Sequence, residues 1–330
     1  MSRFFPQPVV LVSRCLGFAS CRYDGQRLRA GIVELLQGHV RFIDICPEMA
    51  AGLGVPRAPI RLCLKGETIE VWQPARSRSV TQQLETAAAG ILPLFEGCDG
   101  AVLKSASPSC GLHDAKVFRS RDQPHVLCRK SGMLGEKILA AAANRAVDDE
   151  KRLNNTVLCE HFLIKLYAST RFRNIAMTMK MRDLVSFHAS YKFLFLAYNE
   201  QHFRQCGRIA ANHEKLCREE AFSLYRAEMA RLLAHPFRRE AMVNTLYHAY
   251  GLVAKGLAAE EKRYIINIME EYRNERVPLQ AVTRLIERQA LRFDQQYLLG
   301  QALFQPFPAE LSLITGSGRR RGGDRWPDLL

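Results

Sequence analysis

An eight-residue stretch from Lys104 to Gly111 holds the side chains best suited to chemistry in this 330-residue chain. A lysine and three alternating serines precede a cysteine there, in the order KSASPSCG. The stretch follows an apolar run, residues 100–103, and a short apolar run that stops in Ser, Pro and Gly predicts a buried strand opening into a turn. We therefore expect Cys110 on a loop at the carboxyl end of a strand, among donors that suit an anionic, sulfur-containing centre. A serine-rich turn with a simply buried thiol is the alternative, because free cysteine is often a core residue.

Two further cysteines follow predicted strands. Residues 8–13 are mostly apolar, and residues 40–45 alternate between apolar and polar and carry β-branched side chains. Cys15 and Cys46 follow these two runs. Open α/β sheets bind their ligands outside the carboxyl ends of the strands, so the three thiols are expected to meet at one edge. Three thiolates are one short of a closed four-cysteine site. They would hold a cubane iron–sulfur cluster with one iron left open, and an open iron is a Lewis acid with affinity for soft sulfur.

A carboxylate, Glu48, follows two residues after Cys46. It is a candidate general acid or base, because burial can move the pKa of a carboxyl group toward neutrality. A surface glutamate after a turn proline is the alternative. Asp24 is a weaker candidate for contacting substrate, because turn aspartates usually bond to their own backbone. Cys21 fits either an alternate ligand or a packed thiol.

The loop before Cys110 offers groups that could orient a polar substrate or only cap a turn. These groups are Lys104, Ser105, Ser107 and Ser109. The six cysteines outside these motifs are predicted to be structural: Cys63, Cys98, Cys128, Cys159, Cys206 and Cys217.

Composition limits the protein class. Ten cysteines without a CxxC pair differ from a secreted disulfide framework, so a reducing cytoplasm is the expected location. No run of 18 apolar residues is present, which argues against a spanning helix. The length predicts about two domains.

The first predicted domain covers residues 1–148. Its strands alternate with helices expected at residues 31–36, 80–94 and 133–145. This alternation predicts a mostly parallel, Rossmann-like α/β domain. A charge run, residues 148–152, is interpreted as a solvated boundary.

The second predicted domain, residues 149–315, is all-helical, because apolar residues recur at i, i+3, i+4 and i+7. The expected helices are 157–172, 183–205, 208–234, 237–257, 259–276 and 278–301, with breaks near Gly207, His235-Pro236, Gly256 and Val277-Pro278. Residues 316–330 are expected to form a flexible basic tail.

Charge is uneven along the chain, whose formal net charge is +14. Residues 1–150 carry 19 Lys and Arg against 15 Asp and Glu, whereas residues 151–330 carry 28 against 18. The second half, with a net charge of +10, therefore predicts a polyanionic partner. The candidate phosphate contacts are Arg171, Arg173, Lys192, Arg204, Arg238, Arg239, Lys262 and Arg263.

Taken together, the cysteine motifs resemble a known family. They are Val12-Ser-Arg-Cys15-Leu-Gly, Cys21-Arg-Tyr-Asp24-Gly, Cys46-Pro-Glu48 and Leu103-Lys-Ser-Ala-Ser-Pro-Ser-Cys110-Gly. This set resembles the thiouracil desulfidase (TudS-like) family across about residues 8–145.

The helical half resembles the YbgA-type domain. The motifs that carry this resemblance are Arg152-Leu-Asn, Phe187-His-Ala-Ser-Tyr-Lys192, Glu261-Lys-Arg263, Glu271-Tyr-Arg273 and Val277-Pro-Leu279. The fusion of the two is similar to the desulfidases that act on 4-thiouridine in tRNA.

The resemblance implies a catalytic 4Fe-4S cluster held by Cys15, Cys46 and Cys110. It implies that Glu48 is the catalytic carboxylate and that the catalytic serine belongs to the Ser-Pro-Ser-Cys loop, where we favour Ser107. The implied reaction removes sulfur from thiolated tRNA and yields uridine and sulfide.

Two other functions stay open. A desulfidase of free thiouracil or of 4-thiouridine monophosphate would use the helical domain for oligomerisation. A non-catalytic, metal-containing RNA-binding protein would need no carboxylate at Glu48.

Overall fold

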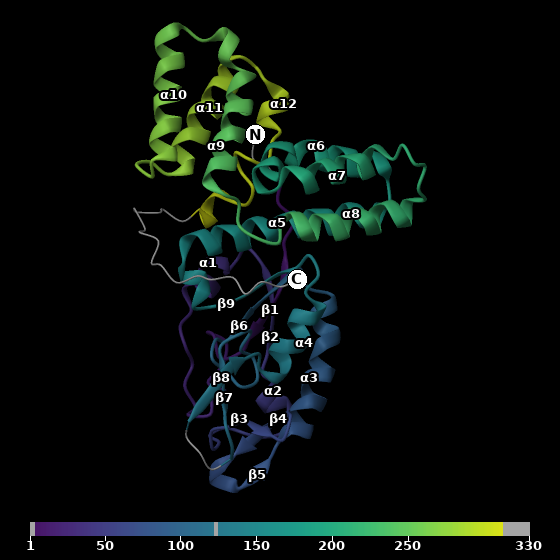
Figure 1. Ribbon diagram of the computed structural model, residues 1–330, viewed down its shortest axis with the longest axis vertical. Helices are drawn as coiled ribbons and strands as arrows, with labels where there is room; N and C mark the ends of the chain where they lie inside the picture. The colour runs from purple at the N-terminus through teal and green to yellow at the C-terminus, as the bar shows by residue number, and fades with distance from the viewer. Residues whose placement is uncertain (1–3, 122–124, 313–330) are drawn as a thin grey trace.

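A four-stranded parallel sheet, sheet A, forms the centre of the N-terminal part of the computed structural model, which describes residues 4–121 and 125–312 (Figure 1). Its strand order is β2-β1-β6-β9, and every neighbouring pair is parallel. The strands are β1 (Val9–Ser13), β2 (Arg41–Ile45), β6 (Gly100–Leu103) and β9 (Ala146–Asp149). Both central strands, β1 and β6, are buried along their whole length, as their continuous apolar runs predict.

Helices cover both faces of sheet A. They are α1 (Gly31–Leu36), α2 (Pro47–Ala50), α3 (Thr81–Glu96) and α4 (Met133–Ala141). Alternate residues of β1 point to opposite faces. Leu11 therefore packs with Phe95 of α3 and Ile138 of α4, whereas Val10 packs with the core that contains Leu36 of α1. The predicted α/β fold is confirmed.

A second sheet, sheet B, was not predicted. Its order is β5-β4-β3-β7-β8, and its pairs are antiparallel except for β3 with β7. The elements are β3 (Arg61–Lys65), β4 (Thr68–Gln73), η1 (Pro74–Arg76), β5 (Arg78–Ser79), β7 (Ala115–Phe118) and β8 (Val126–Lys130). Sheet B lies at the end of the molecule farthest from the helical part (Figure 1).

The C-terminal part is helical, as predicted. Its elements are η2 (Arg152–Asn154), α5 (Thr156–Thr178), α6 (Met181–Tyr198), α7 (Glu200–Ala211), α8 (Arg218–Leu232), α9 (Arg239–Gly251), η3 (Ala254–Gly256), α10 (Ala259–Arg273), α11 (Leu279–Arg292), α12 (Gln296–Leu299) and η4 (Ala309–Leu311). Helices α6, α7 and α8 extend sideways as an arm, and α9, α10 and α11 form a separate group above α5 (Figure 1). No described helix is long and apolar enough to cross a membrane.

Several predicted helix boundaries are wrong, and the clearest cases lie at Asn199 and Gly207. The helix expected over 183–205 ends before Asn199, whose side chain accepts a hydrogen bond from the backbone N–H of His202 and caps α7. The break expected near Gly207 is absent, because Gly207 lies inside α7. A Cβ there would stand 3.1 Å from Nε2 of His188, so the glycine allows close packing of α6 and α7. The chain turns instead at Asn212, with a positive φ of 48°.

One apolar core joins the two parts of the chain. It runs from Val10 and Val12 of β1 through Phe162 and Leu166 of α5 to Tyr225 of α8. Helix α5 therefore belongs structurally to both parts. The predicted boundary near residue 148 falls within β9, and the predicted tail lies outside the described residues.

Candidate active site

Three cysteines follow the carboxyl ends of neighbouring strands of sheet A. Cys15 comes two residues after β1, Cys46 directly follows β2, and Cys110 lies on the loop after β6. These strands are adjacent in the order β2-β1-β6 and run parallel, so their carboxyl ends share one edge. The structure therefore brings all three cysteines to the edge where the sequence placed them.

The pKa values of the thiols show that they interact. Burial raises the pKa of Cys110 well above its usual value, the thiols of Cys15 and Cys46 raise it further, and a hydrogen bond with Ser13 lowers it. Burial and the neighbouring Cys46 raise the pKa of Cys15 to about 11, against a lowering effect of Lys104. Coulombic effects fall off with distance, so the three thiols lie within electrostatic range of one another.

Cys21 is a fourth thiol at this edge. Its side chain is buried and hydrogen-bonds with the thiol of Cys46. Burial, followed by the charge and hydrogen bond of Cys46, raises the pKa of Cys21 to about 12. Cys21 therefore adds another thiol beside the three cysteines that the motifs predict as metal ligands.

Glu48 faces the loop that carries Cys110. It lies in α2, which begins with Pro47, a residue whose fixed φ suits the first helical position. The hydroxyl of Ser109 donates to Oε1 of Glu48 at 3.0 Å. Nε of Arg57 donates to Oε2 at 2.7 Å, and Nη2 of Arg57 stands 2.5 Å from the same oxygen. Both carboxylate oxygens are therefore oriented by protein donors.

The serine loop, residues 104–111, is held in place by hydrogen bonds between its own residues. Oγ of Ser107 accepts hydrogen bonds from the backbone N–H groups of Ser109 at 3.2 Å and Cys110 at 3.0 Å. The N-terminus of α4 packs directly against this loop. A Cβ on Gly135 would come 2.1 Å from the carbonyl oxygen of Gly111, so only glycine fits there. Ser107 and Gly135 together set the position of Cys110.

Glu150 binds the start of the same loop. Its Oε1 accepts from Nζ of Lys104 at 2.5 Å and from Oγ of Ser105 at 2.8 Å, and its Oε2 accepts from the backbone N–H of Ser105 at 2.8 Å. The Glu150 side chain is only 10% exposed. The interpretation of residues 148–152 as a solvated boundary is therefore wrong for Glu150.

Sequence reasoning missed three residues of this site: Ser13, Arg57 and Glu150. Ser13 accepts a hydrogen bond from the backbone N–H of Lys104 at 2.9 Å, which links the ends of β1 and β6. The sequence offered one signal for Arg57, a single arginine between two prolines in an uncharged segment. Asp24 accepts from the backbone N–H of Gln26 at 3.1 Å, as expected of a turn aspartate.

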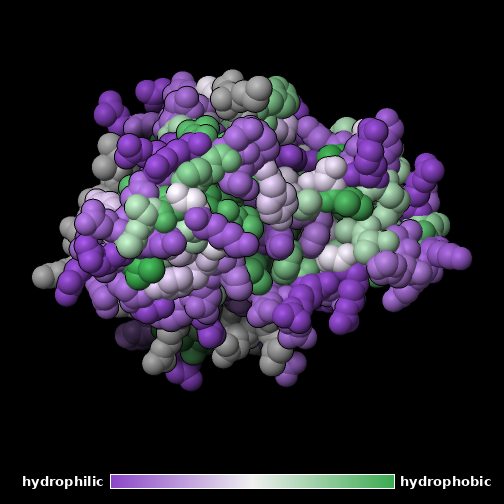
Figure 2. All heavy atoms as spheres, turned by 90° about the horizontal axis from the view of Figure 1, so that it is seen from above, coloured by the Kyte–Doolittle hydropathy of each residue, from purple (hydrophilic) through white to green (hydrophobic). Residues whose placement is uncertain are grey.

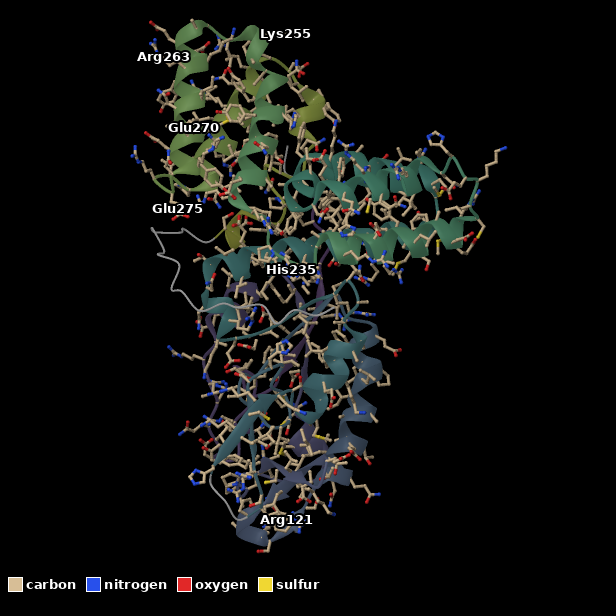
Figure 3. The ribbon with its side chains drawn as sticks, viewed as in Figure 1. Arg121, His235, Lys255, Arg263, Glu270 and Glu275 are labelled. Carbon is tan, nitrogen blue, oxygen red and sulfur yellow. The ribbon has the colours of Figure 1, made fainter. Side chains whose placement is uncertain are left out.

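The predicted RNA contacts are spread from α5 to α10. Three are held by ion pairs: Arg173 with Asp99, Arg204 with Glu200 and Arg239 with Glu275. Two others lie near aromatic rings: Arg171 over Tyr191 and Lys192 over Phe193. From the helical end, the surface is mostly hydrophilic with small apolar areas (Figure 2). Arg263 stands on α10 at the end opposite sheet B (Figure 3).

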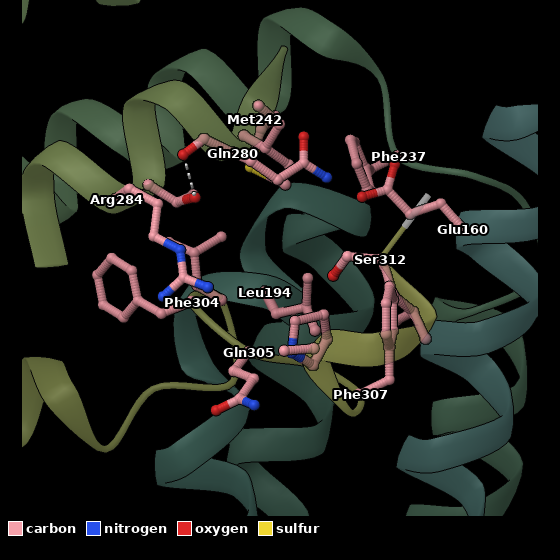
Figure 4. A pocket seen from close by; sticks show the side chains of 16 residues that line it. Glu160, Leu194, Phe237, Met242, Gln280, Arg284, Phe304, Gln305, Phe307 and Ser312 are labelled. Atoms are coloured by element: carbon pink, nitrogen blue, oxygen red, sulfur yellow. Dashed lines mark hydrogen bonds between the residues drawn. The ribbon is translucent and has the colours of Figure 1, made fainter. Parts of the chain in front are cut away.

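A separate cavity of about 50 Å³ lies in the helical part (Figure 4). Its wall includes Glu160 of α5, Phe237, and Gln280 of α11, and the carboxylate of Glu160 stands beside the Phe237 ring. Burial raises the pKa of Glu160 to about 7. None of the predicted catalytic residues or metal ligands lines this cavity.

Fold and site together define an α/β domain with a thiol-rich edge, fused to a helical domain. Residues 10–150 match the family model described as 2-thiouracil desulfurase, and residues 192–308 match the one described as a protein of unknown function, DUF1722. The chain belongs to the 2-thiouracil desulfurase family through its N-terminal part and joins that domain to a YbgA-like DUF1722 domain.

Individual relatives match each half. The uncharacterised protein YbgA of Escherichia coli (strain K12) is 26% identical over 131 residues, which are 39% of this chain and 78% of YbgA. The uncharacterised protein YbbK of Bacillus subtilis (strain 168) is 30% identical over 112 residues, which are 31% of this chain and 73% of YbbK. A solved structure, the [4Fe-4S]-dependent thiouracil desulfidase TudS, is 28% identical with a TM-score of 0.38 and covers 46% of this chain and 97% of its own.

Proposed function

We propose that this protein is an iron–sulfur-dependent desulfidase that removes sulfur from 4-thiouridine in tRNA. Membership in the 2-thiouracil desulfurase family supports a desulfidase acting on thiolated uracil. The observation that carries the proposal is that three cysteines follow adjacent parallel strands at one sheet edge, where hydrogen bonds orient the carboxylate of Glu48.

The donor set fits an iron–sulfur cluster. Among the residues that the structure describes, no three His, Cys, Asp or Glu side chains are grouped to share one metal ion. A cubane cluster differs from a single ion, because each cysteine binds a different iron and the thiols stand further apart. Cys15, Cys46 and Cys110 would hold the cluster. Their thiols must lose protons on binding, so loading is expected to release protons.

The protein's own groups would handle water and the base. When bound, the cluster supplies a Lewis-acidic iron with affinity for thiocarbonyl sulfur. Glu48 would take a proton from the water that adds to the ring carbon and return it as the C–S bond breaks. One thiocarbonyl and one water give one carbonyl and one hydrogen sulfide, without net oxidation or reduction. Ser107 is proposed as the catalytic serine.

Four further groups are proposed to orient the substrate. Ser109 touches Glu48, and Lys104 and Ser105 lie on the same loop, held by Glu150. The fourth group is Asp24, in the turn after Cys21. Its described contacts are with Gln26 and Arg22 of its own turn rather than with the serine loop.

A tRNA substrate is favoured by the charge of the second half. Residues 151–330 carry a net charge of +10, which suits a phosphate backbone. A base inside a stacked helix cannot reach a sheet edge, so the thiolated base would have to be unstacked first. The helical domain would hold the phosphates while the base enters.

The test compares two substrates of the same anaerobically reconstituted protein. Thiolated tRNA and 4-thiouridine monophosphate are incubated separately, and sulfide release is measured at several salt concentrations. The proposal expects kcat/KM to be higher for tRNA and to fall steeply with salt. Equal or faster turnover of the mononucleotide, with a flat salt response, would assign the activity to free thiolated nucleotides, which the thiouracil family description also allows.

A further inference from the structure

Arg57 is the most completely bound buried cation near the candidate site. Its side chain is 3% exposed. Besides its two contacts with Oε2 of Glu48, it donates from Nη1 to the carbonyl oxygen of Gly54 at 2.7 Å and from Nη2 to that of Cys21 at 3.0 Å. All three of its nitrogen atoms therefore have acceptors.

We infer that Arg57 is the positioning residue of Glu48. Arg57 fixes Oε2 of Glu48, so that the other oxygen, Oε1, faces Ser109 on the loop that carries Cys110. The inference rests on the proposed function, in which Glu48 moves the proton. Arg57 itself touches neither the cysteine thiols nor the serine loop in any contact described above.

The guanidinium shape is essential to this role. Arginine presents several N–H donors in a rigid plane, whereas lysine has one nitrogen on a flexible chain. A lysine at position 57 would keep the positive charge beside Glu48, but its one nitrogen could not occupy the positions of Nε, Nη1 and Nη2 together. Charge and geometry can thus be separated by one substitution.

Arg57 also connects two segments that carry cysteines. Its backbone N–H donates to the carbonyl oxygen of Tyr23 at 2.9 Å, next to the side-chain bond with Cys21. The turn after Cys21 and the segment from Cys46 to Arg57 are therefore tied at two points. This tie holds Glu48 in a fixed relation to the cysteine edge.

Arg14 provides a matched control. It is also an arginine next to a cysteine of the site, and its Nε donates to Asp44 at 2.5 Å. Its side chain is 42% exposed, against 3% for Arg57. Exposed ion pairs contribute little, whereas breaking a buried pair leaves an uncompensated charge.

The first experiment compares Arg57→Lys with Arg14→Lys in the full-length, anaerobically reconstituted protein. Arg57→Lys is expected to lower kcat by about 10²-fold, since small misplacements of a reacting group have effects of that size. KM, iron and sulfide content and the melting temperature should stay close to wild type, and Arg14→Lys should leave kcat within about threefold. Unchanged kcat in Arg57→Lys would overturn the inference. So would a loss of kcat that follows a loss of iron or a lower melting temperature.

A second comparison covers the case in which Arg57→Lys does not fold. Glu48→Gln with Arg57→Gln removes both buried charges together, which avoids an unpaired one. If Arg57 acts through Glu48, the double variant should be as slow as Glu48→Gln alone. A further loss in the double variant would show an independent role and overturn the inference. Retained activity in Glu48→Gln would refute the role of Glu48 as well, so failure of the proposed function is distinguishable from failure at Arg57 alone.

Discussion

The two parts of this molecule use polar side chains in opposite ways. In the α/β part, Glu48, Arg57, Ser109 and Glu150 are largely buried and bound to one another or to the cysteine loop, all near one sheet edge. In the helical part, the cations are distributed over several helices, and many are exposed. Concentrated and oriented groups suit chemistry, whereas dispersed charge suits contact with an extended polyanion.

The greatest loss of activity is expected when one thiol of the α/β part is removed. Cys110→Ala should abolish sulfur release and lower the iron content, because the thiol is buried at the shared edge. Cys217→Ala is the control, since Cys217 is exposed at the start of α8 in the helical part. Iron analysis and sulfide release are the measurements. Full activity in Cys110→Ala would remove the cysteine edge from the mechanism.

The second prediction concerns the core that joins the parts. Leu166 of α5 is fully buried in this core and lies against β6 at Gly100. Leu166→Ala should lower the free energy of unfolding by about 2–5 kcal/mol, because it leaves a cavity. Leu291→Ala, at a 65% exposed residue of α11, should change it little. Urea unfolding followed by circular dichroism measures both. Two well-separated transitions in the wild type would contradict a single cooperative core.

The third prediction uses the raised pKa of Glu160, about 7 in the folded protein. When the pKa of an acid is higher in the folded state than in the unfolded state, its contribution to stability is complete at pH values below the unfolded-state pKa. This contribution is lost as the pH rises through the folded-state pKa. The free energy of unfolding of Glu160→Gln, relative to wild type, should therefore rise by about 3 kcal/mol between about pH 4.5 and 7 and stay at that level above it. Urea midpoints of both proteins across this range test it. A constant difference with pH would show that Glu160 does not titrate as described.

The fourth prediction concerns the cations of the helical part, for which only a small change is expected. Each cation that contacts a phosphate should contribute about one unit to the slope of log Kd for tRNA against log salt. Lys262→Ala should reduce this slope if α10 contacts RNA, whereas Arg204→Ala is expected to have less effect because Arg204 already pairs with Glu200 at 2.5 Å. An unchanged slope in Lys262→Ala would place the RNA contact elsewhere.

Hydrophobic periodicity and motifs predicted most of the helices and the strands of sheet A, but they predicted few of the contacts between distant segments. The strand ends before Cys15, Cys46 and Lys104 were found where expected, because short apolar runs and turn residues are local signals. Sheet B was missed, since its strands pair partly over long sequence separations. The break expected at Gly207 was wrong, because the packing of His188, on the neighbouring helix, determines the need for glycine there.

Local sequence patterns were enough to predict that three cysteines follow three strand-like runs, that Glu48 comes after one of these cysteines, and that the second half is helical and basic. The strand order β2-β1-β6, which brings those cysteines to one sheet edge, could be read only from the folded chain. The inward orientation of Arg57 and Glu150, which hold the groups of the site, was likewise visible only in the fold. This difference arises because helix and strand patterns depend on nearby residues. The partners of a buried charge depend on segments that only folding brings together.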